Sequence, residues 1–253
     1  MIPMEAITSR KNKTVCHLRS LASDGAYRSS VGEYVCDGEK TLCEALSNGI
    51  EPVCVLWKEQ PARSIVLPES VQQYTAPAEL FEYASPLRSS GGPVFSVKIP
   101  ERAEPERAER VIVLEGLQDP GNVGTVIRTA NAFGMDAVVL VGACADLYNP
   151  KTVRATMGAI FRQCVIKTDN AGLSSLLERW RLPLYGAALS DRAEDLRGTE
   201  LKRCAVAVGS EGSGLSRELL GLCDKEIIIP MRPCSESLNA AVAASVLMWE
   251  MTR

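Results

Sequence analysis

The pattern of apolar and polar positions is clearest between residues 111 and 142. Val111–Leu114 is a short, β-branched apolar run, which predicts a buried strand. Apolar residues then recur at helical spacing as far as Gly134, a predicted C-cap, and Ala137–Val141 is a second apolar run. A strand, a helix and a strand in this order predict two parallel strands in a sheet covered on both faces.

Two polar residues of this stretch lie outside its apolar stripe. Asp119-Pro120-Gly121 predicts a turn, so Asn122 is expected to be the N-cap of the helix. Arg128 is expected to project from the face opposite the apolar stripe. On an arbitrary helix such an arginine is usually solvated, and an asparagine at a helix start is usually a cap. Neither residue by itself indicates chemistry.

The alternation of strands and helices continues to the C-terminus. Further strands are expected at residues 163–166, 184–188, 204–208 and 226–229, and helices at 150–158, 173–181, 217–222 and 239–251. Residues 111–253 are therefore predicted to form an α/β domain with a mainly parallel sheet. In such sheets, ligands bind beyond the carboxyl ends of the strands.

The first hundred residues predict a smaller α/β domain. Strands are expected at residues 52–57, 66–67 and 92–99, and helices at 39–46 and 78–83. Residues 101–110 are charged and interrupted by proline, with no core-forming residue larger than alanine, and predict a linker.

Composition excludes several classes of protein. Of the 253 residues, 46% are hydrophobic and 23% charged, which is typical of a soluble globular chain. We expect a cytoplasmic protein, because no segment is apolar for long enough to span a bilayer and the N-terminus has no apolar signal region. Nine cysteines without a C-x-x-C pair, and a single histidine, His17, argue against a zinc site and against a histidine base.

The distribution of charge gives a weaker indication. A net charge of −3 is not typical of a nucleic-acid-binding protein. Between Arg10 and Arg28, however, cations outnumber acids, and the single acid in this interval is Asp24. We consider these cations a candidate RNA-binding patch, although such residues are often merely solvated: Arg10, Lys11, Lys13, Arg19 and Arg28.

Three loops follow strands of the larger domain: Gly116–Arg128, Gly209–Ser216 (GSEGSGLS) and Ile229–Asn239 (IPMRPCSESLN). Glycines after a strand allow a ligand to approach the backbone closely. The chain has no G-x-x-x-x-G-K-[ST] motif, and its glycines do not fit G-x-G-x-x-G, which argues against a nucleotide-dependent oxidoreductase. Taken separately, each loop is more typical of a structural turn than of a site.

Taken together, the loops resemble the three motifs of the SpoU (TrmH) family of RNA ribose 2′-O-methyltransferases, in the SPOUT superfamily. The matching segments are DPGNVGTVIRTANAFG, VGSEGSGLS, and IPM followed by SLNAAVA, in that order. Asn149–Phe161 (NPKTVRATMGAIF) adds a fourth matching segment. Residues 17–46 are similar, less sharply, to the N-terminal substrate-binding domain that many members carry.

The resemblance implies a trefoil knot in the C-terminal domain, a homodimer, and S-adenosylmethionine as cofactor, with no metal. It assigns the catalytic machinery to Asn122, Arg128, Glu211 and Asn239. It assigns the cofactor pocket to Val208, Gly209, Ile229, Met231, Ser237 and Leu238. For Ile229 and Leu238, ordinary core packing is the alternative, and it is compatible with an apolar adenine pocket.

The roles of the catalytic residues follow from chemistry. A ribose hydroxyl must lose its proton as its oxygen attacks the sulfonium methyl group. Arginine is a poor base, so Arg128 is expected to orient the ribose and to stabilise the developing alkoxide. Glu211 is expected to order its loop, and Asn122 to position Arg128 and the ribose.

Two further functions stay open beside methylation of ribosomal RNA, such as 23S rRNA. One is ribose methylation of tRNA, and the other is a catalytically idle RNA-binding assembly factor on the same fold. The N-terminal domain favours rRNA over tRNA, and the four intact polar residues argue against an idle factor.

Overall fold

The stretch from residue 111 to 142 folds as the predicted strand, helix and strand. The computed structural model describes residues 4–62, 64–87, 90–101, 103–232 and 237–253. In it, β6 (Arg110–Glu115) is followed by α5 (Pro120–Phe133) and β7 (Ala137–Val141). β6 and β7 pair in parallel, as predicted. Gly134 ends α5 in the left-handed conformation, which confirms the predicted C-cap.

The start of α5 differs from the prediction. Asp119 caps the helix, because its carboxylate accepts a hydrogen bond from the N–H of Asn122 at 2.8 Å. Pro120 occupies the first helical position, where a missing N–H leaves no hydrogen bond unmade. The Asp-Pro-Gly run is therefore the beginning of the helix. Asn122 lies in the first turn, and its side-chain amide is free of the capping role.

β6 and β7 belong to a seven-stranded sheet in the unit formed by residues 102–145 and 162–253, called unit 2. The strand order is β10-β12-β9-β11-β6-β7-β8, and every strand pair is parallel. The other strands are β8 (Val165–Thr168), β9 (Leu184–Ala187), β10 (Glu194–Asp195), β11 (Cys204–Val208) and β12 (Lys225–Ile228). The predicted α/β class with a mainly parallel sheet is confirmed.

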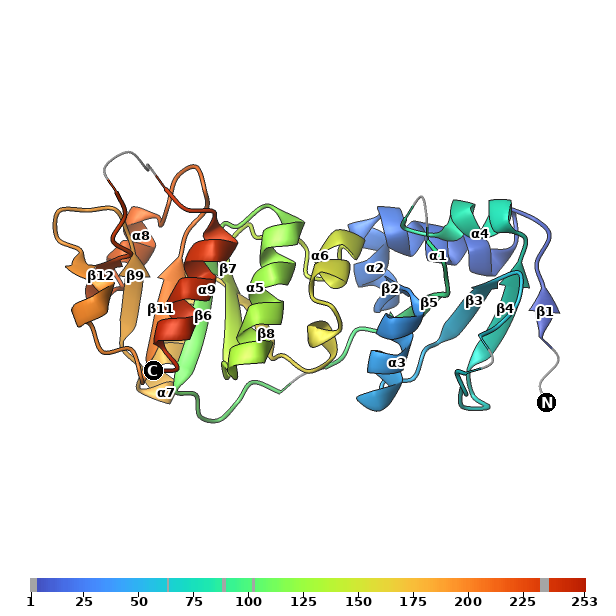
Figure 1. Cartoon of the computed structure of the whole chain (residues 1–253), viewed down its shortest axis with the longest axis horizontal. Helices are drawn as coiled ribbons and strands as arrows, with labels where there is room; N and C mark the ends of the chain where they lie inside the picture. Colours follow the sequence, from blue (N-terminus) through green and yellow to red (C-terminus); the bar gives the residue numbers. More distant parts are fainter. Residues whose placement is uncertain (1–3, 63, 88–89, 102, 233–236) are drawn as a thin grey trace. The chain divides into compact units, whose positions relative to one another are not determined.

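Helices cover both faces of this sheet. They are α5, α7 (Asn170–Trp180), α8 (Arg217–Leu220) and α9 (Ala240–Glu250), with a 3₁₀ turn, η2, at Leu196–Gly198. α7 buries Leu173, Leu177 and Trp180 against Val111 and Val139 of the sheet. α5 and α9 lie side by side along the sheet, drawn in green and red in Figure 1. The trefoil knot stays a prediction, and residues 233–236 of the third motif lie outside the described residues.

Unit 1 comprises residues 1–101 together with 146–161. Its five-stranded sheet has the order β1-β4-β3-β5-β2, in which β5 runs antiparallel to both of its neighbours. The strands are β1 (Glu5–Ala6), β2 (Glu33–Asp37), β3 (Cys54–Lys58), β4 (Gln72–Ala76) and β5 (Val94–Lys98). The helices are α1 (Lys13–Ser23), α2 (Gly25–Val31), α3 (Glu39–Ser47), α4 (Ala78–Ala84) and α6 (Pro150–Ala155), with a 3₁₀ turn, η1, at Ala159–Phe161.

The strand predicted at residues 66–67 is wrong. These residues lie outside any strand, and Val66 is 87% exposed. The strand that lies next along the chain and pairs in parallel with β3 is β4, whose sequence QQYTA shows little apolar character. A strand of this kind is stabilised by backbone pairing with its neighbour and buries few of its own side chains. Its sequence therefore lacks the alternation of apolar and polar residues by which a strand is predicted.

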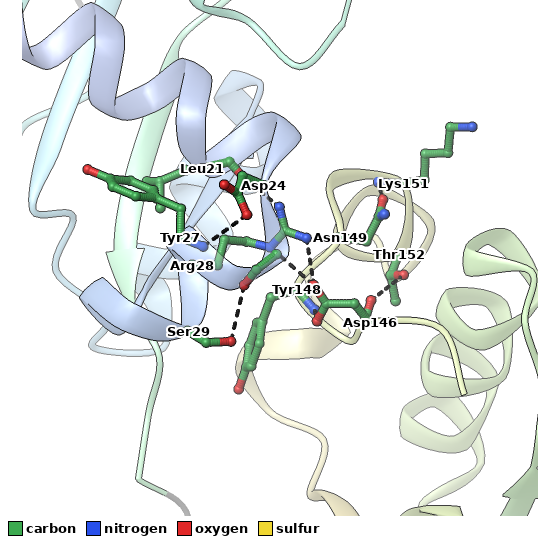
Figure 2. A network of polar contacts seen from close by, with 11 residues as sticks. Leu21, Asp24, Tyr27, Arg28, Ser29, Asp146, Tyr148, Asn149, Lys151 and Thr152 are labelled. Atoms are coloured by element: carbon green, nitrogen blue, oxygen red, sulfur yellow. Dashed lines mark hydrogen bonds and ion pairs between the residues drawn. The ribbon is translucent and has the colours of Figure 1, made fainter. Parts of the chain in front are cut away.

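Segment 146–161 follows β7 in the sequence but packs within unit 1. The Arg28 guanidinium donates two hydrogen bonds to Asp146 Oδ2, at 2.6 and 3.1 Å, and one to the Leu21 carbonyl at 2.6 Å (Figure 2). The rings of Tyr34 and Tyr148 lie 4.7 Å apart. The segment that the sequence analysis assigned to the larger domain is thus part of the packed body of the smaller one.

Among the described residues, no helix combines the length and the apolar character needed to cross a membrane.

Candidate functional site

The carboxyl ends of β9, β11 and β12 surround a cavity of about 440 Å³, a volume typical of small-molecule sites. Two of the three predicted loops, those after β11 and β12, contribute to its wall, as does the start of α9. All six residues assigned to the cofactor pocket line this cavity: Val208, Gly209, Ile229, Met231, Ser237 and Leu238. The structure therefore brings together residues that are up to thirty positions apart in the sequence.

The loop after β11 forms one wall by folding back on itself. Ser210 and Gly214 form an isolated antiparallel bridge, with the Gly214 N–H donating to the Ser210 carbonyl at 2.9 Å. A Cβ on Gly209 would lie only 2.1 Å from the carbonyl carbon of Gly214. Glycine at position 209 is thus required by the close approach of two backbone segments.

The chemistry of the lining can be stated from the described residues. Apolar side chains such as Leu215, Ile229 and Leu238 dominate it. Its charged side chains are the carboxylates of Glu211 and Glu226, with no lysine or arginine among the described lining residues. Such a cavity suits a ligand that has an apolar ring and a net positive charge.

Three of the four predicted catalytic residues lie in one hydrogen-bonded group. The Asn122 amide nitrogen donates to Glu211 Oε1, and its amide oxygen accepts from Asn239 Nδ2 at 3.1 Å. Asn239 also caps α9, since its amide oxygen accepts from the N–H groups of Ala241 and Val242. Because Glu211 lines the cavity, the group connects the cavity wall to the first turn of α5.

Residues 109–249 match the model of the SpoU rRNA methylase family. This chain belongs to that family. The predicted family is confirmed, and so is the prediction of an RNA methyltransferase.

Proteins that are similar to this chain over almost their whole length are also named as RNA methyltransferases. It is 30% identical to the 23S rRNA (guanosine(2553)-2′-O)-methyltransferase RlmP of Bacillus subtilis (strain 168), over 98% of this chain and 99% of the relative. A candidate RNA methyltransferase of the TrmH family from Porphyromonas gingivalis has a similar structure, with a TM-score of 0.85 and 28% identity, over 97% and 98% of the two chains. An RNA 2′-O ribose methyltransferase has a TM-score of 0.80 and 27% identity, over 97% of each chain.

The fourth predicted catalytic residue of this SpoU family member lies apart from the cavity. Arg128 is exposed on α5 and is not among the lining residues. It lies six positions after Asn122 on the helix, which is about 9 Å along the axis and roughly 120° around it. Its guanidinium forms no hydrogen bond or ion pair with any side chain in the described part of the chain. Within the described part of the chain, the Arg128 guanidinium is thus left available to a group from outside this chain.

Part of the cavity is formed by residues that the sequence did not indicate. Residues 187–190, at the end of β9 and directly after it, line the cavity, and so does Glu226 of β12. The Glu226 carboxylate accepts a hydrogen bond from the Ser190 hydroxyl and pairs with Arg192 at 3.1 Å. Because β9 lies between β11 and β12 in the sheet, its carboxyl end must lie beside theirs, a relation that appears only once the strand order is known.

The candidate RNA-binding patch of this SpoU family chain needs one correction. Arg10, Lys11, Lys13 and Arg19 are exposed, but Arg28 is only 5% exposed. Its guanidinium is engaged by Asp146 and the Leu21 carbonyl, so it is not available to a phosphate. The spacing of cations along the sequence did not reveal this, because the Asp146 partner lies 118 positions away.

The thiols near the sheet are unreactive. Burial raises the pKa of Cys204 to about 12, and burial together with Glu226 and Asp224 raises that of Cys223 to about 12. A thiol with so high a pKa stays protonated at neutral pH and is a poor nucleophile. These cysteines therefore serve as packing residues beside the candidate site.

Proposed function

We propose that this RNA methyltransferase transfers the methyl group of S-adenosylmethionine to a ribose 2′-hydroxyl of ribosomal RNA. The observation that carries the proposal is the position of Glu211, which lines the cavity and also binds Asn122. The cofactor cavity and the predicted catalytic asparagine thereby belong to one site. The printed activity of the Bacillus subtilis relative, a 23S rRNA 2′-O-methyltransferase, supports ribosomal RNA as the substrate class.

The cavity fits the cofactor. S-adenosylmethionine supplies an electrophilic methyl group on a positively charged sulfur. Ile229 and Leu238 offer apolar surface for the adenine ring, and the folded-back loop at Gly209 offers main-chain groups. The Glu211 carboxylate, which has no cationic partner among the described residues, favours a cationic ligand, whereas that of Glu226 is already paired with Arg192.

The roles of Asn122 and Glu211 follow from their hydrogen bonds, and that of Arg128 from the chemistry of its guanidinium. Asn122 is fixed at both ends of its amide by Glu211 and Asn239, so it can hold the ribose in a defined orientation. Glu211 is engaged as an acceptor and orders its loop, which is a structural task and not that of a base. Arg128 orients the ribose, anchors the adjoining phosphate and stabilises the developing alkoxide.

A homodimer completes the site. The outer face of the α5–α9 pair exposes apolar side chains, with Val242 50% and Trp249 54% exposed. Phe133 packs against Trp249, with ring centroids 5.7 Å apart. An exposed apolar and aromatic face of this kind is typical of an interface between subunits. We place the second subunit on this face, and the partner subunit's Arg128 then serves the cavity that lacks an arginine of its own.

The candidate RNA-binding patch near the N-terminus binds the RNA. The guanidinium groups of Arg10 and Arg19 lie 4.9 and 4.2 Å from the ring centroid of Tyr83, which fixes two cations beside an aromatic surface. Lys11 and Lys13 are exposed and add charge that can meet phosphates. Ribosomal RNA as substrate implies that the protein works in the cytoplasm.

The test uses methyl transfer from labelled S-adenosylmethionine to purified ribosomal RNA that lacks the modification. Asn122→Ala and Arg128→Ala should each lower the rate by about 100-fold or more while RNA binding is retained. Gln118→Ala and Arg217→Ala are the matched controls, since both residues are exposed and the described residues give their side chains no hydrogen bond. Arg128→Lys should also be slow, because lysine lacks the forked donors of arginine.

The competing functions give different results. Methylation of tRNA with no activity on rRNA would indicate a tRNA enzyme. Binding of RNA and of S-adenosylhomocysteine without methyl transfer by the unmodified protein would indicate an idle assembly factor. Near-normal turnover of Arg128→Lys would refute the role given to the guanidinium.

A further inference from the structure

A carboxylate outside the assigned catalytic residues ties two segments of the site together. Glu115, the last residue of β6, accepts a hydrogen bond from the Ser216 N–H at 2.7 Å and another from the Ser216 hydroxyl at 2.6 Å. The Ser216 hydroxyl oxygen also accepts from the N–H of Leu219 at 3.1 Å, and so caps α8. Three hydrogen bonds thus run from the end of β6 through Ser216 into α8.

The backbone that carries Glu115 is fixed. Glu115 lies opposite Val141 in the parallel ladder between β6 and β7. The next residue, Gly116, turns the chain with φ of +63° and donates its N–H to the Val141 carbonyl at 3.1 Å. The Leu117 carbonyl accepts from the N–H of Ala145 at 2.8 Å. The carboxylate is therefore presented from the rigid end of a buried strand, directly before the turn that leads to α5.

The segment that Glu115 binds ends the wall of the cavity. The loop from Gly209 to Ser216 folds back at Gly214, and Glu211 at its tip binds Asn122. Ser216 is the point where this loop passes into α8. The tip of the loop is thus joined to α5 through Asn122, and its end is joined to β6 through Glu115. Since α5 follows β6 directly, both attachments lead to the same short stretch of chain, residues 115–122.

We infer that Glu115 is a positioning residue for methyl transfer, which sets the place of the 209–216 loop against α5. This inference rests on the proposed function and adds to it a residue that touches neither the cavity nor the reacting groups. An ionised carboxylate suits the role, because one oxygen can accept from the Ser216 N–H while the other accepts from the hydroxyl. Without this anchor, the Asn122–Glu211 contact and the cavity wall would both lose their fixed geometry.

The test is Glu115→Gln, with Glu218→Gln as the matched control. Both variants remove one negative charge, and Glu218 is an exposed residue of α8 whose side chain has no hydrogen bond to the described residues. Glutamine at position 115 offers one acceptor oxygen in place of two and no charge, so the Ser216 hydroxyl loses its ionised acceptor and can at most accept a hydrogen bond from the amide group. We expect kcat to fall by about 10-fold and binding of S-adenosylhomocysteine to weaken several-fold, with RNA affinity unchanged.

Two further measurements separate positioning from general stability. Amide hydrogen exchange in residues 210–216 should accelerate by about 10-fold in Glu115→Gln, while exchange in α7 stays as in the unmodified protein. Ser216→Ala removes the hydroxyl side of the same contact and also the cap of α8, so the double variant should be little worse than Ser216→Ala alone. If Glu115→Gln fails to fold, the single variant Ser216→Ala still tests the contact.

The inference is overturned if Glu115→Gln keeps the kcat, the S-adenosylhomocysteine affinity and the local exchange rates of the unmodified protein. It is also overturned if the losses of Glu115→Gln and Ser216→Ala simply multiply. Failure of the proposed function looks different, because the unmodified protein would then methylate no RNA. Ligand binding and exchange would still decide the role of Glu115 in that case.

Discussion

The ion pair between Arg28 and Asp146 gives the most direct test of how the smaller unit is held together. Arg28→Met keeps much of the apolar stem of the side chain but removes the guanidinium. The change breaks both hydrogen bonds to Asp146 and leaves the Leu21 carbonyl without its donor (Figure 2). Since Asp146 belongs to segment 146–161, the loss should be felt where that segment meets the N-terminal residues.

The magnitude follows from burial. Removing one partner of a fully buried ion pair costs about 3–5 kcal/mol, because the other charge is left unpaired. The Arg28 side chain is 6% exposed but that of Asp146 is 39% exposed, so water can hydrate the carboxylate that remains. The larger residual penalty is the Leu21 carbonyl, at about 1–3 kcal/mol. We therefore expect a loss of about 2 kcal/mol in the local stability of unit 1.

Hydrogen exchange measures this loss without assuming two-state unfolding of a two-unit protein. Amides of α2 and of residues 146–161 should exchange about 30-fold faster in Arg28→Met, and amides of β11 should not change. Lys13→Met, which removes an exposed cation of α1, is the control and should leave exchange unaltered.

The same variants separate a structural arginine from an RNA contact. Lys13→Met should reduce the slope of log affinity against log salt by roughly 0.7, the value for one phosphate of single-stranded RNA, while Arg28→Met should leave the slope unchanged. An unchanged exchange pattern in Arg28→Met, together with a reduced salt slope, would refute the reasoning and return Arg28 to the RNA-binding patch.

Three further predictions concern unit 2. Gly209→Ala should weaken S-adenosylhomocysteine binding, measured by calorimetry, by more than about 10-fold, because the new Cβ would collide with the Gly214 backbone. Gly198→Ala, where the Cβ has open space, is the control and should leave the affinity unchanged. Equal affinities in the two variants would contradict this. Trp249→Glu should shift the protein from dimer to monomer in sedimentation experiments, and an unchanged mass would place the interface elsewhere. Because burial raises the pKa of Cys204 from 9.0 to about 12, only the unfolded state loses this proton between those values, and the free energy of unfolding should fall as pH rises from about 9. A Cys204→Ala variant that keeps the same alkaline loss of stability in denaturant titrations would exclude this thiol as a cause.

The elements of the larger domain could be predicted from the sequence because its strands are buried and its helices amphipathic. β7 and β11 were predicted with the bounds that the structure gives them, since every residue in both is buried. The start of α5 was predicted wrongly because Asp-Pro-Gly is compatible with a turn and equally with a capped helix start. The prediction failed at a local choice between two conformations that the same residues allow.

The candidate site likewise has residues that could be predicted from the sequence and residues that could not. The resemblance assigned residues of three motifs to one site, and the structure places seven of them, Glu211 included, around one cavity. Hydrogen bonds join Glu211 to Asn122 and Asn122 to Asn239. The contribution of β9 and the anchor at Glu115 could not be predicted, because both depend on which strands and loops are neighbours in space. The pairing of Arg28 with Asp146 is of the same kind: neither residue differs in the sequence from an ordinary surface charge.

The membership of segment 146–161 in unit 1 has a practical consequence. The chain passes from one unit to the other near residues 101, 145 and 161, so the smaller unit is not a contiguous module. A fragment ending at residue 101 would lack α6 and would uncover Tyr34, which is 2% exposed in the intact protein. Grafting unit 1, to which we assign RNA binding as a proposal, onto another methyltransferase therefore requires transferring the later segment with it.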